Sequence, residues 1–415
     1  MSVVTQSSRQ QDAALRRRAA AVIPGGMYGH QDASRLPQAF PQFFERAQGS
    51  HIWDCDGREY VDLMCSWGPI LLGHKHPKVE QAAAEQRAKG DCQNGPGRVM
   101  VELAELLVER VSHADWAMFA KNGTDVTTTA LMVARAATGR RKVLAARRSY
   151  HGSAPWCTPR LDGTAPGDRE NIVLFEYNDI PSAIAAAEIA GDDLAGVIVT
   201  PFRHDAGYDQ ELVDPAFARS LRELCDRRQA ALILDDVRCG LRLHEGGSWE
   251  PIGVEPDLST WSKGIANGHA LSALLGNDQF RDGAKRLFVT GSFWFSAASM
   301  AAAIATLHAH HDEGALERME RAGSLLRSGL DEQAASYGLR IRQTGPVQMP
   351  FLTFAGDKDY ERARLFAGTA LEDGTYLHPM HNWFLSAAHS DDDIQRVLEA
   401  TDHAFRAVHE EYGGD

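Results

Sequence analysis

Short, mostly apolar runs recur through the middle of the chain, at residues 142–145, 195–199, 231–234 and 271–275. The stretches between them are longer and carry apolar residues at helical spacing. Runs of this kind are typical of strands buried on both faces, and the helices between them are typical of crossover connections in a parallel sheet. The pattern therefore predicts an α/β fold with a large, doubly wound, mainly parallel sheet.

The two ends of the chain are poorer in such runs, and residues 391–410 show a helical pattern. A chain of 415 residues is long enough for two or three structural units at about 150 residues per domain. We expect residues 1–70 to be an N-terminal segment that belongs to a small domain. Residues 71–325 should form the large, ligand-binding sheet domain, and residues 326–415 should complete the small α+β domain.

The net charge and the apolar runs of the chain limit the partners that we expect. Lys and Arg number 43 against 56 Asp and Glu, which gives a formal net charge of −13. A negative field repels polyanions, so we expect no nucleic-acid partner. The longest apolar runs are shorter than the roughly 18 residues of a membrane helix, and the N-terminus lacks the apolar core of a secretory signal. We therefore expect no membrane partner and a cytoplasmic location.

Cysteine and histidine give no metal signature. The six cysteines form no C-x-x-C pair, so they are expected to be reduced and mostly buried. The histidines cluster at residues 74–76 and 308–311 without the carboxylate partner of an H-E-x-x-H helix. The sequence thus predicts no metal site.

Lys263 and Asp235 are the candidate reactive pair. Lys263 is one of only eight lysines and lies in the apolar, Gly-bordered segment Trp261-Ser262-Lys263-Gly264-Ile265. An amine desolvated there becomes a nucleophile suited to a Schiff base, although a lysine that extends its ammonium to water is the competing interpretation. Asp235 follows the run 231–234 at the expected ligand-binding edge of the sheet, although Asp235-Asp236 is also typical of a helix N-cap.

The Asp235 carboxylate and the Lys263 amine fit the two ends of pyridoxal phosphate (PLP), whose protonated ring nitrogen needs an anionic partner. The chain contains neither G-x-G-x-x-G nor a P-loop, so a dinucleotide or nucleotide lacks its phosphate cradle. Asn122-Gly123-Thr124-Asp125, at the start of a helical pattern, offers backbone N–H groups to a phosphate. An ordinary Thr or Asp N-cap is the alternative, and no capping box is expected.

Taken in order, the motifs of the chain resemble those of the class-III PLP-dependent aminotransferases of fold type I, and most closely the glutamate-1-semialdehyde aminomutase branch. The matching segments are Ile23-Pro24-Gly25-Gly26, Trp53-Asp54-Cys55-Asp56-Gly57, Ser66-Trp67-Gly68-Pro69, Gly73-His74, Asn122-Gly123-Thr124, Tyr150-His151-Gly152, Asp235-Asp236-Val237, Pro256-Asp257-Leu258, Lys263 and Ser386-Ala387-Ala388-His389. The resemblance covers nearly the whole chain.

The resemblance implies the role of each matching residue. Lys263 would form the Schiff base, Asp235 would pair with the ring nitrogen, and Tyr150 would stack on one ring face. The residues that would bind the cofactor are Asn122, Gly123, Thr124, Tyr150, His151, Asp235, Val237, Lys263 and Ser292. The family also implies a homodimer in which Ser292, at the position of the family's threonine, reaches the phosphate of the neighbouring subunit.

The substrate side departs from the aminomutase pattern. An ungapped comparison places Asp32 where the aminomutases carry a carboxylate-binding arginine, and His381 lies where they have a glutamate. Trp67, Tyr28, Asp32 and His381 are the expected substrate residues, and Asp32 should disfavour a substrate carboxylate. We expect an aminotransferase that moves an amino group from a donor to a ketone or aldehyde. The alternatives are a 2,1-aminomutase or amino-acid epimerase, and a PLP-binding scaffold without catalysis.

Overall fold

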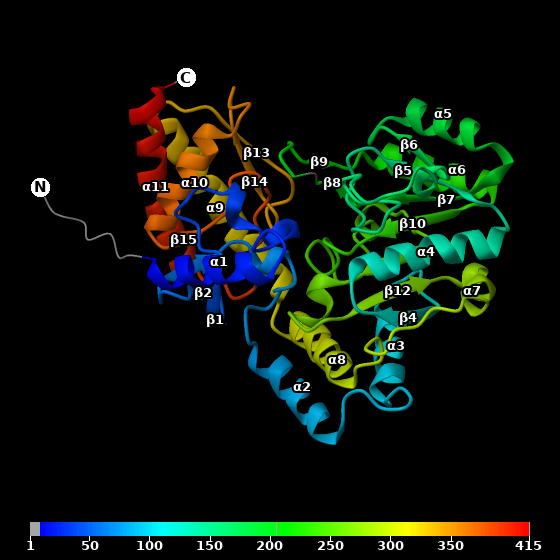
Figure 1. Ribbon diagram of the computed structural model, residues 1–415. Coiled ribbons are helices and arrows are strands. Elements are labelled where there is room, and N and C mark those ends of the chain that lie inside the picture. Colours follow the sequence, from blue (N-terminus) through cyan, green and yellow to red (C-terminus); the bar gives the residue numbers. More distant parts are fainter. Residues whose placement is uncertain (1–8, 205, 415) are drawn as a thin grey trace, which may run out of the picture.

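The computed structural model describes residues 9–204 and 206–414, and its largest element is a seven-stranded sheet (Figure 1). The strand order is β4 (Trp116–Ala120), β12 (Ser272–Gly276), β11 (Leu258–Trp261), β10 (Ala231–Asp235), β7 (Leu194–Val199), β5 (Lys142–Ala146) and β6 (Ile172–Phe175). Strands β11, β10, β7, β5 and β6 pair in parallel. The predicted α/β fold with a mainly parallel sheet is confirmed.

One strand runs against the prediction. The run at residues 271–275 was expected to be parallel, but β12 pairs antiparallel with both β11 and β4. Only residues 262–271 connect β11 to β12. A parallel return needs a crossover of about a dozen residues or more, so this connection brings the chain back antiparallel.

Helices cover both faces of the sheet because alternate residues of each strand point to opposite sides. In β10, Leu232 and Leu234 pack with α5 (Ile180–Ala190) and α6 (Pro215–Arg228). Ala231 and Ile233 pack with α4 (Gly123–Thr138) and α7 (Asp278–Lys285) on the other face. Every residue of β10 is therefore buried.

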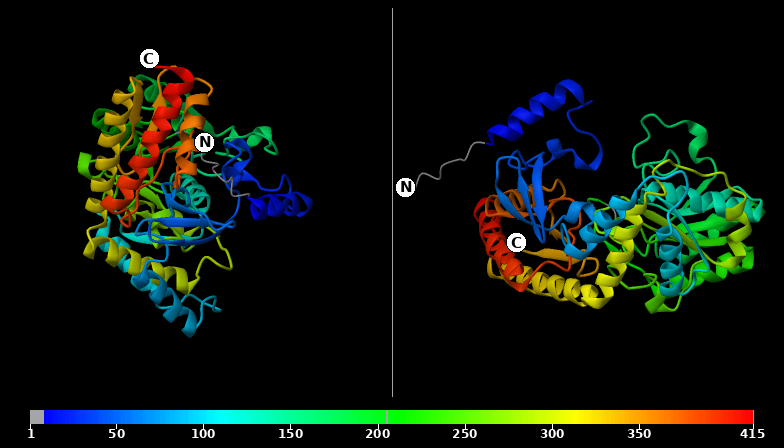
Figure 2. Two further views of the ribbon diagram at one scale, coloured as in Figure 1. Left: turned by 90° about the vertical axis from the view of Figure 1, so that its left-hand side faces the viewer. Right: turned by 90° about the horizontal axis from the view of Figure 1, so that it is seen from below.

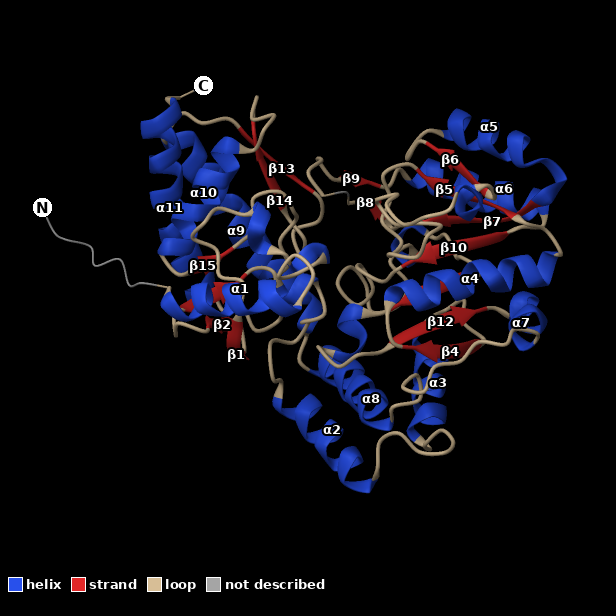
Figure 3. Ribbon diagram, in the orientation of Figure 1, coloured by secondary structure: helices blue, strands red, loops and turns tan. Residues whose placement is uncertain are grey.

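Three further helices lie beside this domain and connect it to the rest of the chain (Figure 3). They are α2 (Pro77–Lys89), α3 (Val99–Arg110) and α8 (Ala297–Asp312). Helix α8 contacts both α2 and α3. A short hairpin, β8 (Phe202–Arg203) with β9 (Glu211–Leu212), follows β7.

The two ends of the chain meet in a second lobe (Figure 2). The C-terminal strand β15 (Thr375–Tyr376) pairs in parallel with the N-terminal strand β3 (Glu59–Asp62). The other elements of this lobe are α1 (Gln10–Val22), β1 (Phe44–Gln48), β2 (His51–Asp54), α9 (Ala315–Ser336), β13 (Ile341–Thr344), β14 (Phe351–Phe354), α10 (Glu361–Glu372) and α11 (Asp391–Tyr412). The predicted helical pattern at residues 391–410 lies within α11.

All six cysteines are free, and four of them are buried. The histidine clusters make polar contacts, such as His76 with Glu313 and His311 with Glu245. Within residues 9–204 and 206–414 no helix is long and apolar enough to cross a membrane.

The packing of α9 gives a matched test of the core. Leu326 is fully buried, whereas its neighbour Leu325 is 41% exposed. Leu326→Ala should lower the free energy of unfolding by about 2–5 kcal/mol because it leaves a cavity. Leu325→Ala should lower it by less than about 1 kcal/mol. Equal losses in denaturant unfolding curves would contradict this assignment of the core.

Candidate functional site

Asp235 and Lys263 lie at the carboxyl ends of two neighbouring strands. Asp235 is the last residue of β10 and faces Thr260 of β11 in the strand register. Lys263 opens the short helix η7 (Lys263–Ala266) just after β11. No helix begins at Asp235 or Asp236 in the described chain, so the helix-cap interpretation of this pair is wrong. Asp236 instead accepts hydrogen bonds from Ser248.

The Asp235 carboxylate is 3% exposed and held from both sides. His151 Nδ1 lies 2.6 Å from Oδ2, while the Thr260 hydroxyl donates to Oδ1 at 3.1 Å. The Val237 backbone N–H also donates to Oδ1, at 3.2 Å. The Thr127 hydroxyl fixes His151 by donating to its carbonyl oxygen at 2.8 Å. A buried carboxylate so oriented is suited to a cationic ring nitrogen.

Lys263 is partly exposed, and its backbone is left-handed with a φ of 50°. Burial of the ammonium lowers the pKa of Lys263 to about 7, and the positive charge of Arg238 lowers it further against the opposing effect of Asp235. A Cβ built on Gly68 would lie 3.4 Å from Lys263 Cδ, so the Gly68 backbone packs directly on the lysine stem. The amine is therefore available in its neutral, nucleophilic form near pH 7.

The N-terminus of α4 lies beside this pair. Asn122 caps the helix, and the Asp125 carboxylate accepts from the Asn122 N–H at 2.8 Å. The prediction that no capping box exists is thus wrong, because Asp125 lies at the third helical position. A Cβ on Gly123 would come within 2.7 Å of Val237 Cγ1, so Gly123 and Val237 are in close contact.

Thr124 joins the same cluster. Its hydroxyl accepts from the Ser153 N–H at 3.1 Å, and a Cβ on Gly152 would come within 2.4 Å of it. Two glycines therefore allow the backbone to approach the helix terminus closely, which is what a phosphate cradle requires. Together with the buried Asp235 and the desolvated Lys263, these residues fit PLP.

Tyr150 and Ser292 are more exposed. Tyr150 is 40% exposed; burial raises the pKa of its phenol, and the charges of Arg238 and Asp235 also act on it. Tyr150 directly precedes His151, whose ring contacts the Asp235 carboxylate. Ser292 is exposed on a segment where Phe293 is 67% exposed.

Trp67 is the centre of an aromatic cluster on the substrate side. Its ring lies edge-on to His30 and to His381, each at 4.9 Å between centroids, and to His378 at 5.4 Å. Of the predicted substrate residues, Trp67 and His381 are thus in contact. Sequence reasoning missed His30 and His378.

Within residues 9–204 and 206–414, neither Asp32 nor Tyr28 makes a hydrogen bond or a ring contact with this aromatic cluster. Asp32 caps the short helix η2 (Ala33–Arg35) by accepting from the Ser34 N–H at 2.9 Å. Tyr28 is 73% exposed. Their substrate roles stay predictions, and the described contacts of Asp32 are local.

Arg238 is the charged residue that sequence reasoning missed. It is 8% exposed, and Nη1 donates to Asn382 Oδ1 at 2.7 Å. A signal was present in the sequence, because Arg238 comes three positions after Asp235, beyond the carboxyl end of a buried strand.

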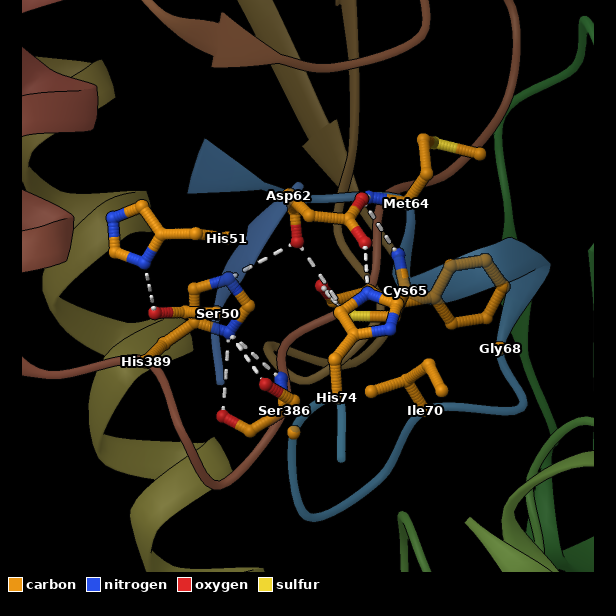
Figure 4. Close-up of polar contacts among 12 residues, drawn as sticks. Ser50, His51, Asp62, Met64, Cys65, Gly68, Ile70, His74, Ser386 and His389 are labelled. Carbon is orange, nitrogen blue, oxygen red and sulfur yellow. Dashed lines mark hydrogen bonds and ion pairs between the residues drawn. The ribbon is translucent and has the colours of Figure 1, made fainter. Parts of the chain in front are cut away.

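A buried network supports the loop that carries Trp67 (Figure 4). The Asp62 carboxylate accepts from the N–H groups of Met64 at 2.8 Å and Cys65 at 3.0 Å, and His74 Nε2 lies 2.8 Å away. One carboxylate thus joins the start of the loop to its end. Loss of any one of these three partners would leave part of the buried Asp62 charge uncompensated, so the network resists movement of the loop.

His389 connects this loop to the C-terminal part of the chain (Figure 4). Its Nδ1 lies 2.9 Å from the Ser386 N–H and accepts from it, so the proton is on Nε2, which donates to the Asp62 carbonyl oxygen at 3.1 Å. This arrangement needs a neutral ring, and burial lowers the pKa of His389 accordingly. The loop is therefore anchored by both ends of the chain.

The Lys263 environment predicts an unusual pH dependence of reactivity. In the cofactor-free protein, a pKa of about 7 leaves most Lys263 amines neutral at pH 8, whereas an ordinary lysine is neutral in about 1 of 250 molecules. Acylation of Lys263, followed by peptide mass mapping, should reach half its maximal rate near pH 7, with the exposed Lys89 as reference. Lys263 labelling that rises only above pH 9 would contradict the site geometry.

Comparisons with known proteins identify the family of the chain. The Aminotransferase class-III family model matches residues 33–405. An aminopentol aminotransferase of Sphingopyxis macrogoltabida is 50% identical over 98% of this chain and 96% of its own, and a glutamate-1-semialdehyde 2,1-aminomutase of Chloroflexus aurantiacus is 33% identical over 98% and 99%. The solved FumI protein of Sphingopyxis sp. MTA144, in its PLP internal aldimine form, has a TM-score of 0.96 at 49% identity and covers 97% of each chain. The predicted resemblance is confirmed, and the chain belongs to the class-III aminotransferases, which use PLP.

Proposed function

We propose that Lys263 and Asp235 carry the aminotransferase reaction of this chain. The observation behind this proposal is the desolvated Lys263 amine just after β11, the strand that pairs with the one ending in the buried, His151-bonded carboxylate of Asp235. When bound, PLP supplies an electron sink for the carbon that loses its proton. Lys263 would attach the cofactor through its amine and, when that amine is free, would take up and return the proton as a general base and acid. Asp235 would keep the ring nitrogen protonated.

The remaining residues would hold and orient the cofactor. Gly123 and Thr124 would donate backbone N–H groups to the phosphate at the positive end of α4, with Asn122 as the helix cap. Tyr150 would stack on one face of the ring and Val237 on the other. His151 would act as a positioning residue, because it reaches the ring only through Asp235.

In the overall reaction, the amine becomes a carbonyl compound while a ketone or aldehyde acceptor becomes an amine, so no external oxidant is consumed. We propose that the amino donor is a hydroxylated amine of the aminopentol kind. Its support is the 50% identity to the aminopentol aminotransferase along 98% of the chain. The rings of His30 and His378 give this proposal a chemical basis, because an imidazole nitrogen that is not already bonded can donate to or accept from a hydroxyl group.

A homodimer and a cytoplasmic location complete the proposal. Ser292, exposed in the single chain, would reach the phosphate bound by the neighbouring subunit. Its flanking Phe293 and the 92% exposed Phe288 offer apolar surface for a second copy. The six free cysteines suit a reducing compartment.

The roles of Lys263 and Asp235 can be tested separately. Lys263→Ala should bind PLP without covalent attachment, so borohydride reduction should fix no cofactor to the chain. Asp235→Asn should retain the attachment but slow proton abstraction by about a thousandfold, because the ring nitrogen loses its anionic partner. Cofactor fixed to another lysine, or near-normal turnover of Asp235→Asn, would contradict the assignments. Nitrogen returned to the donor molecule itself would indicate an aminomutase.

The cross-subunit role of Ser292 predicts complementation in mixed dimers. Ser292→Asp should weaken cofactor binding by repelling the phosphate, and Lys263→Ala is inactive. Coexpression of the two variants should restore about a quarter of wild-type activity, because half of the dimers then contain one intact site. Mixed dimers as inactive as either parent would place Ser292 in its own subunit's site, whereas normal cofactor binding by Ser292→Asp itself would place Ser292 outside the sites.

A further inference from the structure

Arg242 is a fully buried arginine that joins three segments of the chain beside the reactive lysine. Its Nη2 donates to the carbonyl oxygens of Gly68 at 2.9 Å and Ile70 at 2.6 Å, in the loop that carries Trp67. Its Nη1 donates to the carbonyl oxygen of Leu385, in the C-terminal segment. Arg242 itself comes shortly after β10. One guanidinium therefore fixes how these three segments lie relative to one another.

No anion balances the charge of Arg242. Within residues 9–204 and 206–414 it forms no ion pair with a carboxylate, and the groups that act on it are the thiols of Cys65 and Cys239. Burial raises the pKa of both thiols, so they are neutral near pH 7. Burial also lowers the pKa of Arg242 to about 10, which leaves the guanidinium charged. A buried cation held by carbonyl dipoles costs stability, which points to a role in function.

Phe384 connects Arg242 to Lys263. The guanidinium carbon of Arg242 lies 5.1 Å from the centroid of the Phe384 ring, within the range of a cation–π contact. A Cβ built on Gly68 would lie 3.0 Å from Phe384 Cε1 and 3.4 Å from Lys263 Cδ. The Gly68 backbone is therefore packed against both the ring and the lysine stem. Arg242 holds this backbone and this ring, and together they limit where the Lys263 amine can lie.

The loop that carries Trp67 needs contacts of this kind. The three residues before Gly68, and Lys263 itself, have positive φ angles between 46° and 65°. Such conformations persist only where surrounding contacts impose them. Arg242 supplies two of these contacts at the carbonyl oxygens directly after the strained residues. Loss of the guanidinium should allow the loop to relax and the lysine stem to move with it.

We propose that Arg242 is a positioning residue of the amino transfer, which holds the loop and the Phe384 ring so that the Lys263 amine faces the carbon that loses its proton. This inference rests on the proposed role of Lys263 and adds the group that orients it. Lys263 must take a proton from one carbon and return it to another, so a small displacement of its amine slows both transfers. Arg242 acts through Gly68 and Phe384 and touches neither substrate nor cofactor in this role.

Single-turnover kinetics of the holoenzyme test the position of the amine. The probe is racemic 2-amino-1-propanol, a short hydroxylated amine, with hydrogen or deuterium at C2, and the signal is the loss of the visible cofactor absorbance. Arg242→Lys keeps a cation but lacks the planar fork that reaches both segments. It should lower the limiting rate constant at saturating amine by at least about tenfold and change the half-saturating concentration by less than about threefold. Deuterium should slow this variant by at least about threefold, because proton abstraction is then the slow step.

Arg140 offers a matched control. Its guanidinium also binds backbone carbonyl oxygens, but those of Leu194, Arg228 and Gln229, at the amino end of β7. Arg140→Lys should keep the limiting rate constant within about twofold of wild type. Phe384→Leu keeps the test decisive if Arg242→Lys does not fold, because it removes the connecting ring without removing a polar group. It should lower the limiting rate constant by at least about fivefold, with the same isotope effect.

Acylation of Lys263 in the cofactor-free chain gives a readout without turnover. Burial lowers the pKa of Lys263 to about 7, and the charge of Arg242 acts in the same direction. The other groups that act on this amine, which every variant retains, are Arg238, Asp235 and Cys239. Arg242→Met removes a cation and loosens the loop against the lysine stem, and both changes raise the pKa. The half-maximal pH of acylation should rise by about one unit, whereas Arg140→Met should leave it near 7.

The outcomes separate this inference from the proposed function. A rate constant near that of wild type in Arg242→Lys or Phe384→Leu, whatever the signal amplitude, would overturn the inference, as would an equal loss in Arg140→Lys. An isotope effect near one in the slowed variant, or an acylation midpoint that Arg242→Met leaves near 7, would also overturn it. If the proposed function fails, the wild-type holoenzyme keeps its absorbance in the presence of the amine, while the acylation midpoints still report whether Arg242 shapes the surroundings of Lys263.

Discussion

The burial of the Asp235 carboxylate at the end of β10 is the constraint on which the rest of the site depends. A carboxylate withdrawn from water must be compensated, and here His151, Thr260 and a backbone N–H share that task. The neighbouring Asp236 is also buried, which raises its pKa to about 7 and so reduces the negative charge next to Asp235. Asp235 is therefore the main negative charge of the site, and its charge opposes the effect of Arg238 on the pKa of Lys263.

Four residues of the candidate site have a strained backbone. Lys263 and the loop residues Cys65, Ser66 and Trp67 all have positive φ angles, between 46° and 65°. Such conformations cost about 1–3 kcal/mol each for residues other than glycine and persist only where surrounding contacts impose them. Asn267 provides such contacts by accepting from the N–H groups of Leu71 and Leu72. Asp62 accepts from the N–H groups of Met64 and Cys65, and Arg242 donates to the carbonyl oxygens of Gly68 and Ile70. The stable network around the loop thus holds Trp67 and the lysine stem in conformations that neither would adopt alone.

The two sides of the reactive amine serve different chemical demands. On the cofactor side, the glycines and Thr124 at the start of α4 leave little freedom, because each contact involves backbone. On the other side, the rings of His30, His378 and His381 surround Trp67, and these contacts are made by side chains. Side-chain contacts can change by single substitutions, whereas the backbone contacts at the start of α4 cannot.

The sequence by itself determined the fold class and indicated the candidate pair Asp235 and Lys263 and the candidate phosphate-binding segment at Gly123. These follow from local patterns: apolar runs specify buried strands, and Asp235 ends such a run. Lys263 lies in an apolar, Gly-bordered segment before another run, and Gly123 opens a helical pattern. The direction of β12 was missed because it depends on the length of a connection, and the cap at Asp125 because it depends on side-chain geometry. Only the tertiary structure brought His30, Trp67, His378 and Arg238 together, since they come from four segments with no shared pattern in the sequence. Their grouping follows from the pairing of β3 with β15 and from the packing of both chain ends against the sheet domain, which are long-range contacts that no local spacing encodes.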